Sequence, residues 1–328
     1  DNGTYTAVGA SGMIRTSSDN GITWTSRTSG LSSSLLAVTH GNGTLVAVGS
    51  GGYIIDSSDG ITWSGLLPYG SDLRGVCYAN NTFVVVSSVS TGRIYTSSDG
   101  RSSVNARHSA GIGELNRVTF GNDTFVAVAN SGKIIRSTDN GSSWDNATSP
   151  TGNNLSGIAF GNDTFVAVGN SGNIVRSTNN GSSWDNATSP TGNTMRGVGF
   201  GNNTFVGVGL LGNIVRSTNN GSTWDNVTSP TGNRLNGITF GNNTFVAVAQ
   251  SGNIVRSTDN GSSWDNVTPP TGNRINGITF GNDTFVAVGL SGNIVRSTDN
   301  GSSWDNATSP TTSNLLGVSF GNNTFVAV

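Results

Sequence analysis

A segment of 40 residues is repeated along most of this 328-residue chain, and this repeat restricts the possible folds more than any other feature. Aromatic residues recur at fixed positions of the repeat with a spacing of 40. They are Phe125, Phe165, Phe205, Phe245, Phe285 and Phe325, and Trp144, Trp184, Trp224, Trp264 and Trp304. A period near 40 made of strand-like segments is typical of β-propellers, in which each repeat supplies one blade.

Each repeat contains four short segments of strand-forming residues, separated by turns rich in Gly, Asn and Asp. In one copy these segments are 155–160, 164–169, 174–178 and 184–188. Short strands joined by such turns predict an antiparallel meander of four strands. The second segment, TFVAVG at 164–169, is apolar almost throughout. This indicates a strand covered on both faces, as in a blade that lies between two neighbours.

The turn between the third and fourth segments has the pattern S-x-D-x-G-x-x-W, as in Ser137–Trp144. The Asp can accept hydrogen bonds from turn backbone N–H groups, the Gly can take a positive φ, and the Trp can fill the space between sheets. Asn replaces Asp in two copies and keeps an acceptor oxygen. We therefore expect structural roles for the tryptophans above and for Asp19, Asp59, Asp99, Asp139, Asn179, Asn219, Asp259 and Asp299.

Because this motif recurs in register, the chain resembles the Asp-box propeller superfamily, also called the bacterial neuraminidase repeat superfamily. The pattern AVGxxGxIxxSxDxGxxW is similar to the photosystem II assembly factor-like branch. The superfamily also includes sialidases and some endoglucanases, and the motif is structural in all of them, so the resemblance implies a fold and not catalysis. The first three units have drifted from the pattern: in the second the turn at 57–63 is one residue short, and in the third Val104 replaces the Trp and two residues are inserted near 87–91.

The repeat predicts an all-β, eight-bladed propeller of four-stranded antiparallel blades that forms one domain over residues 1–328. We expect the C-terminal first strand to complete the N-terminal blade, since such closure removes exposed sheet edges. The TFVAV-type strand, however, occurs nine times, from 4–8 to 324–328. One copy is then redundant, and we expect the sequence to be a fragment of a longer chain.

The composition restricts the partners and the location. Charged residues make up 10% of the chain, against roughly 25% in ordinary domains, and the net charge is −2. No basic run indicates nucleic-acid binding and no apolar stretch is long enough to insert in a membrane. Cys77 is the single cysteine, so the chain has no internal disulfide. Low charge, abundant Asn, Ser and Thr, and repeat amplification predict a secreted or cell-surface protein.

Nothing in the sequence indicates an enzyme, a metal site or a cofactor. A sialidase-like site would need an arginine triad and a Tyr–Glu pair, but Glu114 is the one glutamate. The two histidines, His40 and His108, lack metal-site or triad spacing. Paired carboxylates for glycoside hydrolysis would have to come from Asp56, Asp72 or Glu114.

An arginine recurs once per repeat on the third strand, which favours a scaffold role over catalysis. These residues are Arg136, Arg176, Arg216, Arg256 and Arg296. We expect Arg176 to pair with Asp185 across its hairpin.

Two regions differ among copies that are otherwise nearly identical. One is the loop after the second strand, and the other is the approach to the first strand, which should lie on the same face. Their residues are Asn130, Asn170, Leu210, Gln250 and Leu290, then Asn154, Thr194, Arg234, Arg274 and Asn314, followed by Ser156, Arg196, Asn236, Asn276 and Leu316. Loops on a rigid scaffold often carry binding residues, so this face is a candidate binding face, with neutral drift as the alternative.

The sequence thus favours a non-enzymatic extracellular or cell-surface propeller that serves binding, adhesion or assembly, within a larger repetitive assembly. Its partner would be a protein or a glycan on the variable face. The alternatives are a lectin with one carbohydrate site per blade, a sialidase-like glycoside hydrolase, and an intracellular assembly factor like the photosystem branch.

Overall fold

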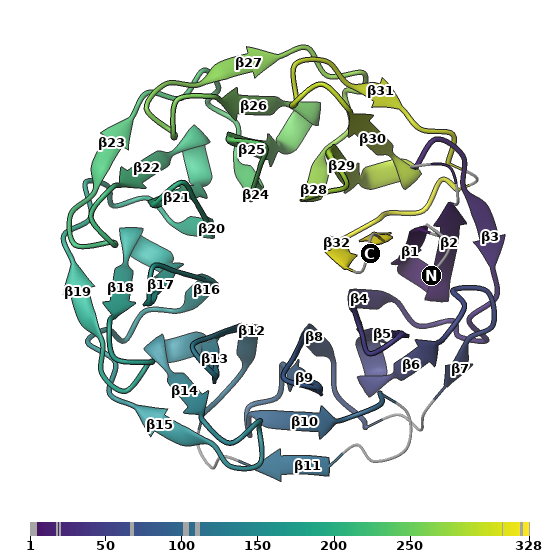
Figure 1. Cartoon of the computed structure of the whole chain (residues 1–328), viewed down its shortest axis with the longest axis horizontal. Coiled ribbons are helices and arrows are strands. Elements are labelled where there is room, and N and C mark those ends of the chain that lie inside the picture. Colours follow the sequence, from purple (N-terminus) through teal and green to yellow (C-terminus); the bar gives the residue numbers. More distant parts are fainter. Residues whose placement is uncertain are drawn as a thin grey trace.

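The computed structural model describes residues 5–17, 19, 21–65, 69–100, 105–108, 112–309, 311–321 and 324–327. The strands form eight sheets arranged in a ring, with both ends of the chain in the same blade (Figure 1). The described helical elements are 3-10 turns of three residues. The predicted eight-bladed, all-β propeller is therefore confirmed, while the unusual Val104 lies outside the described residues.

Each blade begins at the channel and ends at the outer rim. We number the blades from the N-terminus, so that β1 to β3 belong to blade 1 and β4 to β7 form blade 2. The innermost strands of blades 2 to 8 and then blade 1 are β4 (Leu35–Gly41), β8 (Leu73–Ala79), β12 (Leu115–Gly121), β16 (Leu155–Gly161), β20 (Met195–Gly201), β24 (Leu235–Gly241), β28 (Ile275–Gly281) and β32 (Val318–Gly321). The second strands are β1 (Tyr5–Gly9), β5 (Thr44–Gly49), β9 (Thr82–Ser87), β13 (Thr124–Ala129), β17 (Thr164–Gly169), β21 (Thr204–Gly209), β25 (Thr244–Ala249) and β29 (Thr284–Gly289).

The third and fourth strands complete each blade toward the outside. The third strands are β2 (Met13–Ser17), β6 (Ile54–Ser57), β10 (Arg93–Ser97), β14 (Ile134–Ser137), β18 (Ile174–Ser177), β22 (Ile214–Ser217), β26 (Ile254–Ser257) and β30 (Ile294–Ser297). The outermost strands are β3 (Thr25–Arg27), β7 (Ser64–Gly65), β11 (Asn105–His108), β15 (Asp145–Ala147), β19 (Asp185–Ala187), β23 (Asp225–Val227), β27 (Asp265–Val267) and β31 (Asp305–Asn306).

The ring closes in blade 1, where the C-terminal strand β32 is innermost, as expected from the sequence. The redundant strand β33 (Thr324–Ala327) is inserted between β32 and β1, so this sheet has five strands in the order β3-β2-β1-β33-β32. The pair β32–β33 has the antiparallel register of an ordinary first hairpin, whereas β33 and β1 are parallel. Because β33 carries the same sequence as the other second strands, it forms this hairpin and displaces β1 outward. A direct bridge between Leu315 and Gly9 remains.

The core lies between adjacent blades. All six residues of β17 are buried, as their apolar sequence predicts. Trp184 packs in a cluster with Phe165 of its own blade and Val126 of the preceding blade. Its indole Nε1 donates to the Gly181 carbonyl at 3.0 Å, which satisfies the polar group of this buried ring. The tryptophan thus fastens two sheets together without leaving a donor unpaired.

Close contact between innermost strands depends on a glycine without a side chain. Gly161 ends β16, and a Cβ on it would lie 2.1 Å from a ring carbon of Phe200 in the next blade. Gly121 meets Phe160 in the same way, at 2.2 Å. The aromatic ring therefore packs directly on the glycine backbone. Because this Gly–Phe contact recurs between blades, it sets the distance between neighbouring innermost strands.

Hydrogen bonds close the S-x-D-x-G-x-x-W turn. In blade 7 the Asp259 carboxylate accepts from the Ser257 hydroxyl at 2.7 Å and from the Ser263 amide at 2.9 Å, and the Ser257 hydroxyl accepts from the Gly261 amide at 2.8 Å. In blade 5 the side chain of Asn179 makes the equivalent contacts, accepting from the Ser177 hydroxyl and the Ser183 amide. The oxygen acceptor, rather than the charge, is what both versions of the turn share.

Four of the five recurring third-strand arginines, Arg136, Arg176, Arg216 and Arg256, donate hydrogen bonds to the next blade. Arg176 lies opposite Asp185 in the β18–β19 register, as expected, but its guanidinium Nη1 donates at 3.2 Å to the carbonyl of Asn220 in the next blade. Arg136 reaches Asn180 in the same way. These arginines therefore act between blades and not within the hairpin.

Replacing Gly161 with Ala should destabilise the ring by about 2 kcal/mol, because the added methyl group overlaps the Phe200 ring and forces the two blades apart. Thermal melting followed by circular dichroism measures this effect. Gly152→Ala is the matched control, since a Cβ there meets nothing within 4 Å. Equal melting temperatures for the two variants would contradict the role of this contact.

Asp259 should make stability depend on pH in the acid range. Partial burial tends to raise the pKa of Asp259, but hydrogen bonds from Ser263 and Ser257 outweigh it and lower the pKa from 3.8 to about 2. A carboxylate with a lowered pKa stabilises the fold above its unfolded value, and this stabilisation is lost as the pH falls from about 4 to about 2. Asp259→Asn should keep the turn, as Asn179 does, and flatten this part of a pH–stability curve measured by denaturant unfolding. An unchanged curve would refute the assignment.

Candidate binding site at the channel mouth

Two sets of backbone positions define one face of the ring. In blades 2 to 8 the carbonyl of the residue before the innermost strand accepts a hydrogen bond from the first residue after the second strand. In blade 1 the carbonyl of Asn314, which precedes the bridged Leu315, accepts from the Ala10 amide, and all these bonds measure 2.8 to 3.3 Å. We call these carbonyl-bearing residues the rim positions. In order from blade 2 to blade 8 and then blade 1 they are Ser34, Asp72, Glu114, Asn154, Thr194, Arg234, Arg274 and Asn314. The two regions that vary among the repeats are therefore in direct contact on this face.

A β-bulge near the start of the innermost strand aims further side chains at the channel. In blades 2 to 8 the register slips by one residue, for example between Leu115 and Arg117, so that Asn116 has no partner in the ladder. Such a bulge redirects the side chain of the extra residue. These bulge positions are Leu36, Arg74, Asn116, Ser156, Arg196, Asn236 and Asn276, and Leu316 is the equivalent residue of blade 1.

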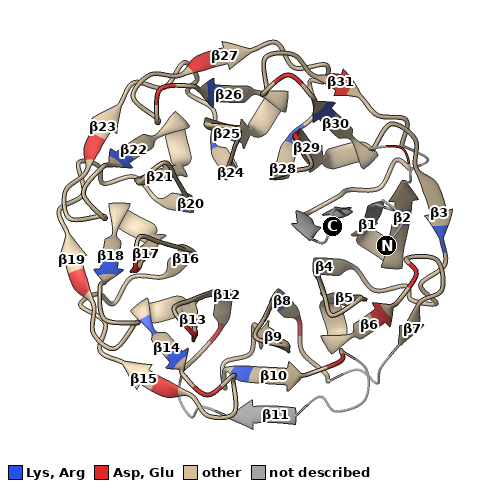
Figure 2. Cartoon of the chain, in the orientation of Figure 1, with Lys and Arg blue, Asp and Glu red and all other residues tan. Residues whose placement is uncertain are grey.

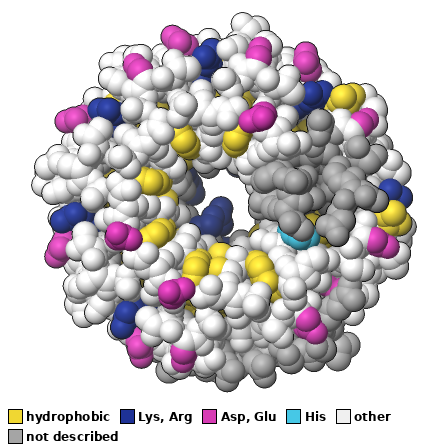
Figure 3. All heavy atoms as spheres, in the orientation of Figure 1, with side chains coloured by type: hydrophobic (Ala, Val, Ile, Leu, Met, Phe, Trp, Pro, Cys, Tyr) yellow, Lys and Arg dark blue, Asp and Glu magenta, His cyan; other side chains and the backbone are white. Residues whose placement is uncertain are grey.

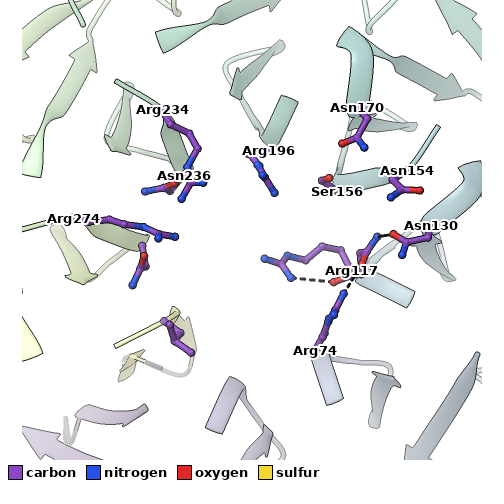
Figure 4. Close-up of a pocket in the computed structure, with 13 residues that line it drawn as sticks. Arg74, Arg117, Asn130, Asn154, Ser156, Asn170, Arg196, Arg234, Asn236 and Arg274 are labelled. Carbon is purple, nitrogen blue, oxygen red and sulfur yellow. Dashed lines mark hydrogen bonds between the residues drawn. The ribbon is translucent and has the colours of Figure 1, made fainter. Parts of the chain in front are cut away.

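Rim and bulge residues together surround a cavity of about 610 Å³ at the mouth of the channel (Figure 4). We call it the mouth cavity. Its lining residues are Arg74, Asn116, Arg117, Asn130, Asn154, Ser156, Asn170, Arg196, Arg234, Asn236, Arg274, Asn276 and Leu316. Figure 3 shows the ring hollowed at its centre, with Lys or Arg side chains inside the hollow.

The mouth cavity is strongly positive although the chain as a whole carries a net charge of −2. Five of the residues that line it are arginines, and none of its described lining residues is acidic. Burial, followed by the nearby charges of Arg274 and Arg196, lowers the pKa of Arg234. Enclosure by the surrounding chain, followed by the charge of Arg74, likewise lowers the pKa of Arg117, although its side chain remains exposed to solvent. The like charges are held close enough to destabilise one another, and an anion would relieve this repulsion.

Most acidic residues lie away from the mouth cavity. Figure 2 places them on the outermost strands, such as β15, β19 and β23, and in turns. At the rim, Asp72 and Glu114 belong to blades 3 and 4, opposite Arg234 and Arg274 of blades 7 and 8. Glu114 lies 3.5 Å from Arg74, and both side chains are about 40% exposed, so this ion pair is weak.

Asparagines at the bulge positions link one blade to the next. The side-chain nitrogen of Asn116 donates to the Leu155 carbonyl at 2.8 Å, and Asn236 and Asn276 donate to the Ile275 and Leu315 carbonyls at 2.6 Å. These bonds hold the cavity wall rigid. The arginines are therefore attached to a rigid wall, and ligand binding would not require the wall to become ordered.

The structure brings together ten residues of the predicted binding face in the mouth cavity: Asn130, Asn154, Ser156, Asn170, Arg196, Arg234, Asn236, Arg274, Asn276 and Leu316. Thr194 and Asn314 are rim residues, and Leu210, Gln250 and Leu290 donate to rim carbonyls, but these five do not line the cavity. Comparison of the repeats within the chain did not identify three residues that line the cavity, Arg74, Asn116 and Arg117. They belong to diverged units, and Arg117 stands where most other copies have Gly, which is the signal that could have identified it.

The other candidates from the sequence do not gather into a site. The Asp56 carboxylate is buried in β6 and accepts from the Ser64 hydroxyl at 2.8 Å, whereas Asp72 accepts from the Gly51 amide at the rim. Burial raises the pKa of the Cys77 thiol to about 12, so it is a poor nucleophile. Burial lowers the pKa of His40.

The part of the chain that the structure describes holds no group of three or more His, Cys, Asp or Glu side chains arranged to bind a metal ion. Within those same residues, no helix has the length and apolar character needed to cross a membrane.

Comparison with solved structures reveals the same architecture in proteins of low sequence identity. YCF48 from Cyanidioschyzon merolae is 16% identical, with a TM-score of 0.61 over 78% of this chain and 92% of that chain. YCF48 bound to D1 peptide is 15% identical, with a TM-score of 0.61 over 89% and 86%. Virginiamycin B lyase from Staphylococcus aureus is 20% identical, with a TM-score of 0.65 over 76% and 89%. These likenesses establish the fold alone.

The sequence itself identifies the family. No curated protein matches it significantly. A family model described as photosynthesis system II assembly factor YCF48, however, matches residues 83–327, which is well over half of the chain. This match agrees with the repeat pattern and with the eight-bladed ring. The chain therefore belongs to the YCF48 family of assembly-factor propellers.

Proposed function

We propose that this protein is a non-enzymatic propeller that binds an acidic segment of a partner protein in the mouth cavity and thereby assists assembly of a larger complex. The observation that carries the proposal is the convergence of five arginines on one cavity whose described lining has no carboxylate. Arginine binds carboxylates through paired hydrogen bonds, so an acidic peptide suits this lining.

The shape of the site supports a peptide as the ligand. An extended chain fits a cavity of about 610 Å³ that opens onto a broad rim. Asparagine side chains and rim backbone groups can bond its amides, while the arginines neutralise its acidic side chains. A related YCF48 protein has been solved bound to D1 peptide, which gives a precedent for peptide binding in this family.

The structural similarity to virginiamycin B lyase does not favour an enzymatic function for this protein. An enzyme of this fold would need a positioned acid, base or metal in the channel. The described residues that line the mouth cavity are arginines, asparagines, a serine and a leucine, which supply neither a base near neutral pH nor metal ligands. These residues suit recognition of an anion and do not suit proton transfer.

Differences between blades argue against a lectin with one equivalent site per blade. The bulge positions hold Arg, Asn, Ser or Leu, depending on the blade. This uneven distribution of side chains around one cavity suits a single asymmetric ligand better than repeated sugar sites. The secreted or cell-surface location predicted from the composition stays a prediction, which the leader sequence of the full-length gene would test.

Replacing Arg234 and Arg274 together with Gln should weaken binding of an acidic peptide roughly tenfold, because two favourable charge contacts are lost. The probe is a fluorescein-labelled peptide of Gly and Ser that carries a run of Glu, and fluorescence anisotropy measures its affinity. Affinity for the unmodified protein should fall as salt is raised, since the contacts are partly exposed.

The control removes two positive charges outside the mouth cavity through Lys133→Asn with Arg256→Gln. Lys133 is exposed after η3 (Asn130–Gly132), and Arg256 lies on β26. This control should bind the peptide like the unmodified protein. If the two double variants bind equally, or if the unmodified protein does not bind the acidic peptide, the proposal is wrong.

A further inference from the structure

The same Arg-x-Asn sequence occurs before two successive bulges but makes different contacts. In blade 7 the Nε of Arg234 donates to the Oδ1 of Asn236 at 2.8 Å. In blade 8 the equivalent atoms, Nε of Arg274 and Oδ1 of Asn276, are both buried and have no hydrogen-bond partner. Both asparagines donate their side-chain nitrogen to a carbonyl of the next blade at 2.6 Å, so their side-chain amides are held alike.

This difference leaves one donor and one acceptor unused at the wall of the mouth cavity. Buried polar atoms are normally paired, because leaving them without a partner costs free energy. Arg274 and Asn276 both line the cavity, so a ligand can reach this part of the wall after a small side-chain rotation. A peptide group offers a carbonyl for the arginine and an N–H for the asparagine oxygen, and it therefore complements the unused pair.

An apolar surface lies beside this pair. Leu316 lines the mouth cavity, and 38% of its surface is exposed. It occupies the bulge position at which blades 7 and 8 carry Asn236 and Asn276. The wall therefore changes from polar at Asn276 to aliphatic at Leu316, in neighbouring blades.

We propose that Arg274, Asn276 and Leu316 form a subsite that binds a peptide group and an adjacent aliphatic side chain, so that the preferred ligand is an acidic peptide containing Leu, Ile or Val. The inference rests on the proposed function, because it specifies the chemistry of the ligand at the same cavity. Removing the exposed Leu316 surface from water is favourable only if an apolar group covers it. A polyanion without apolar groups would leave both Leu316 and the Asn276 oxygen unused.

Two peptide probes separate the general site from the subsite. Both are fluorescein-labelled, consist of Gly and Ser, and carry the same run of Glu, but one has Leu in place of a neighbouring Ser. The unmodified protein should bind both peptides and bind the Leu-containing peptide roughly tenfold more tightly. Fluorescence anisotropy titrations give both affinities.

The diagnostic variant is Leu316→Asn, which installs the residue that blades 7 and 8 carry at this position and therefore suits the fold. It should remove the preference for the Leu-containing peptide, so that the two peptides bind with similar affinity. The matched control is Leu211→Ser. Leu211 is 72% exposed outside the mouth cavity, and Ser171 and Ser251 hold the equivalent backbone conformation, with φ near 56°. This control should keep the preference.

The outcomes are distinct. A preference for Leu that Leu316→Asn removes and Leu211→Ser keeps supports the subsite. Equal binding of the two peptides by the unmodified protein, or a preference that survives Leu316→Asn, overturns the subsite while the acidic-peptide function stands. Failure to bind either peptide overturns both proposals.

Discussion

Contact between neighbouring blades is the interaction on which the rest of this structure depends. Each sheet is too small to bury its apolar residues alone, so Phe165 and Trp184 are buried only because blade 4 supplies Val126 and its neighbours. Gly161 lets the Phe200 ring approach the backbone, and Arg176 and Asn236 add hydrogen bonds across the gap. Because these contacts repeat around a closed ring, they fix the width of the channel and the shape of its mouth.

The constant scaffold leaves a small set of positions free to differ. A bulge in the innermost strand redirects one side chain per blade toward the channel, and the rim residue two positions earlier lies beside it. Changes at these positions do not disturb the core between the blades. The arginines of blades 3, 4, 6, 7 and 8 therefore create a positive cavity within a chain of nearly balanced charge.

The repeat period and the apolar second strand were enough to predict the propeller, the four-stranded blades and the face on which the variable loops lie. The β-bulge could not be predicted from the repeat, because the residues of Leu115–Gly121 do not differ in type from those of a regular strand. Arg74 and Arg117 were missed for a related reason, since their units have diverged. The insertion of β33 between β32 and β1 was also not foreseen, because identical strand sequences compete for one place in the sheet.

We propose that this propeller holds its partner in the arginine-lined mouth cavity. The most direct measurement is a crystal structure of the chain with an acidic, leucine-containing peptide. We expect an extended peptide across the channel mouth, with carboxylates against Arg234 or Arg196 and an aliphatic side chain on Leu316. A peptide bound on the outer strands, or on the opposite face of the ring, would contradict it.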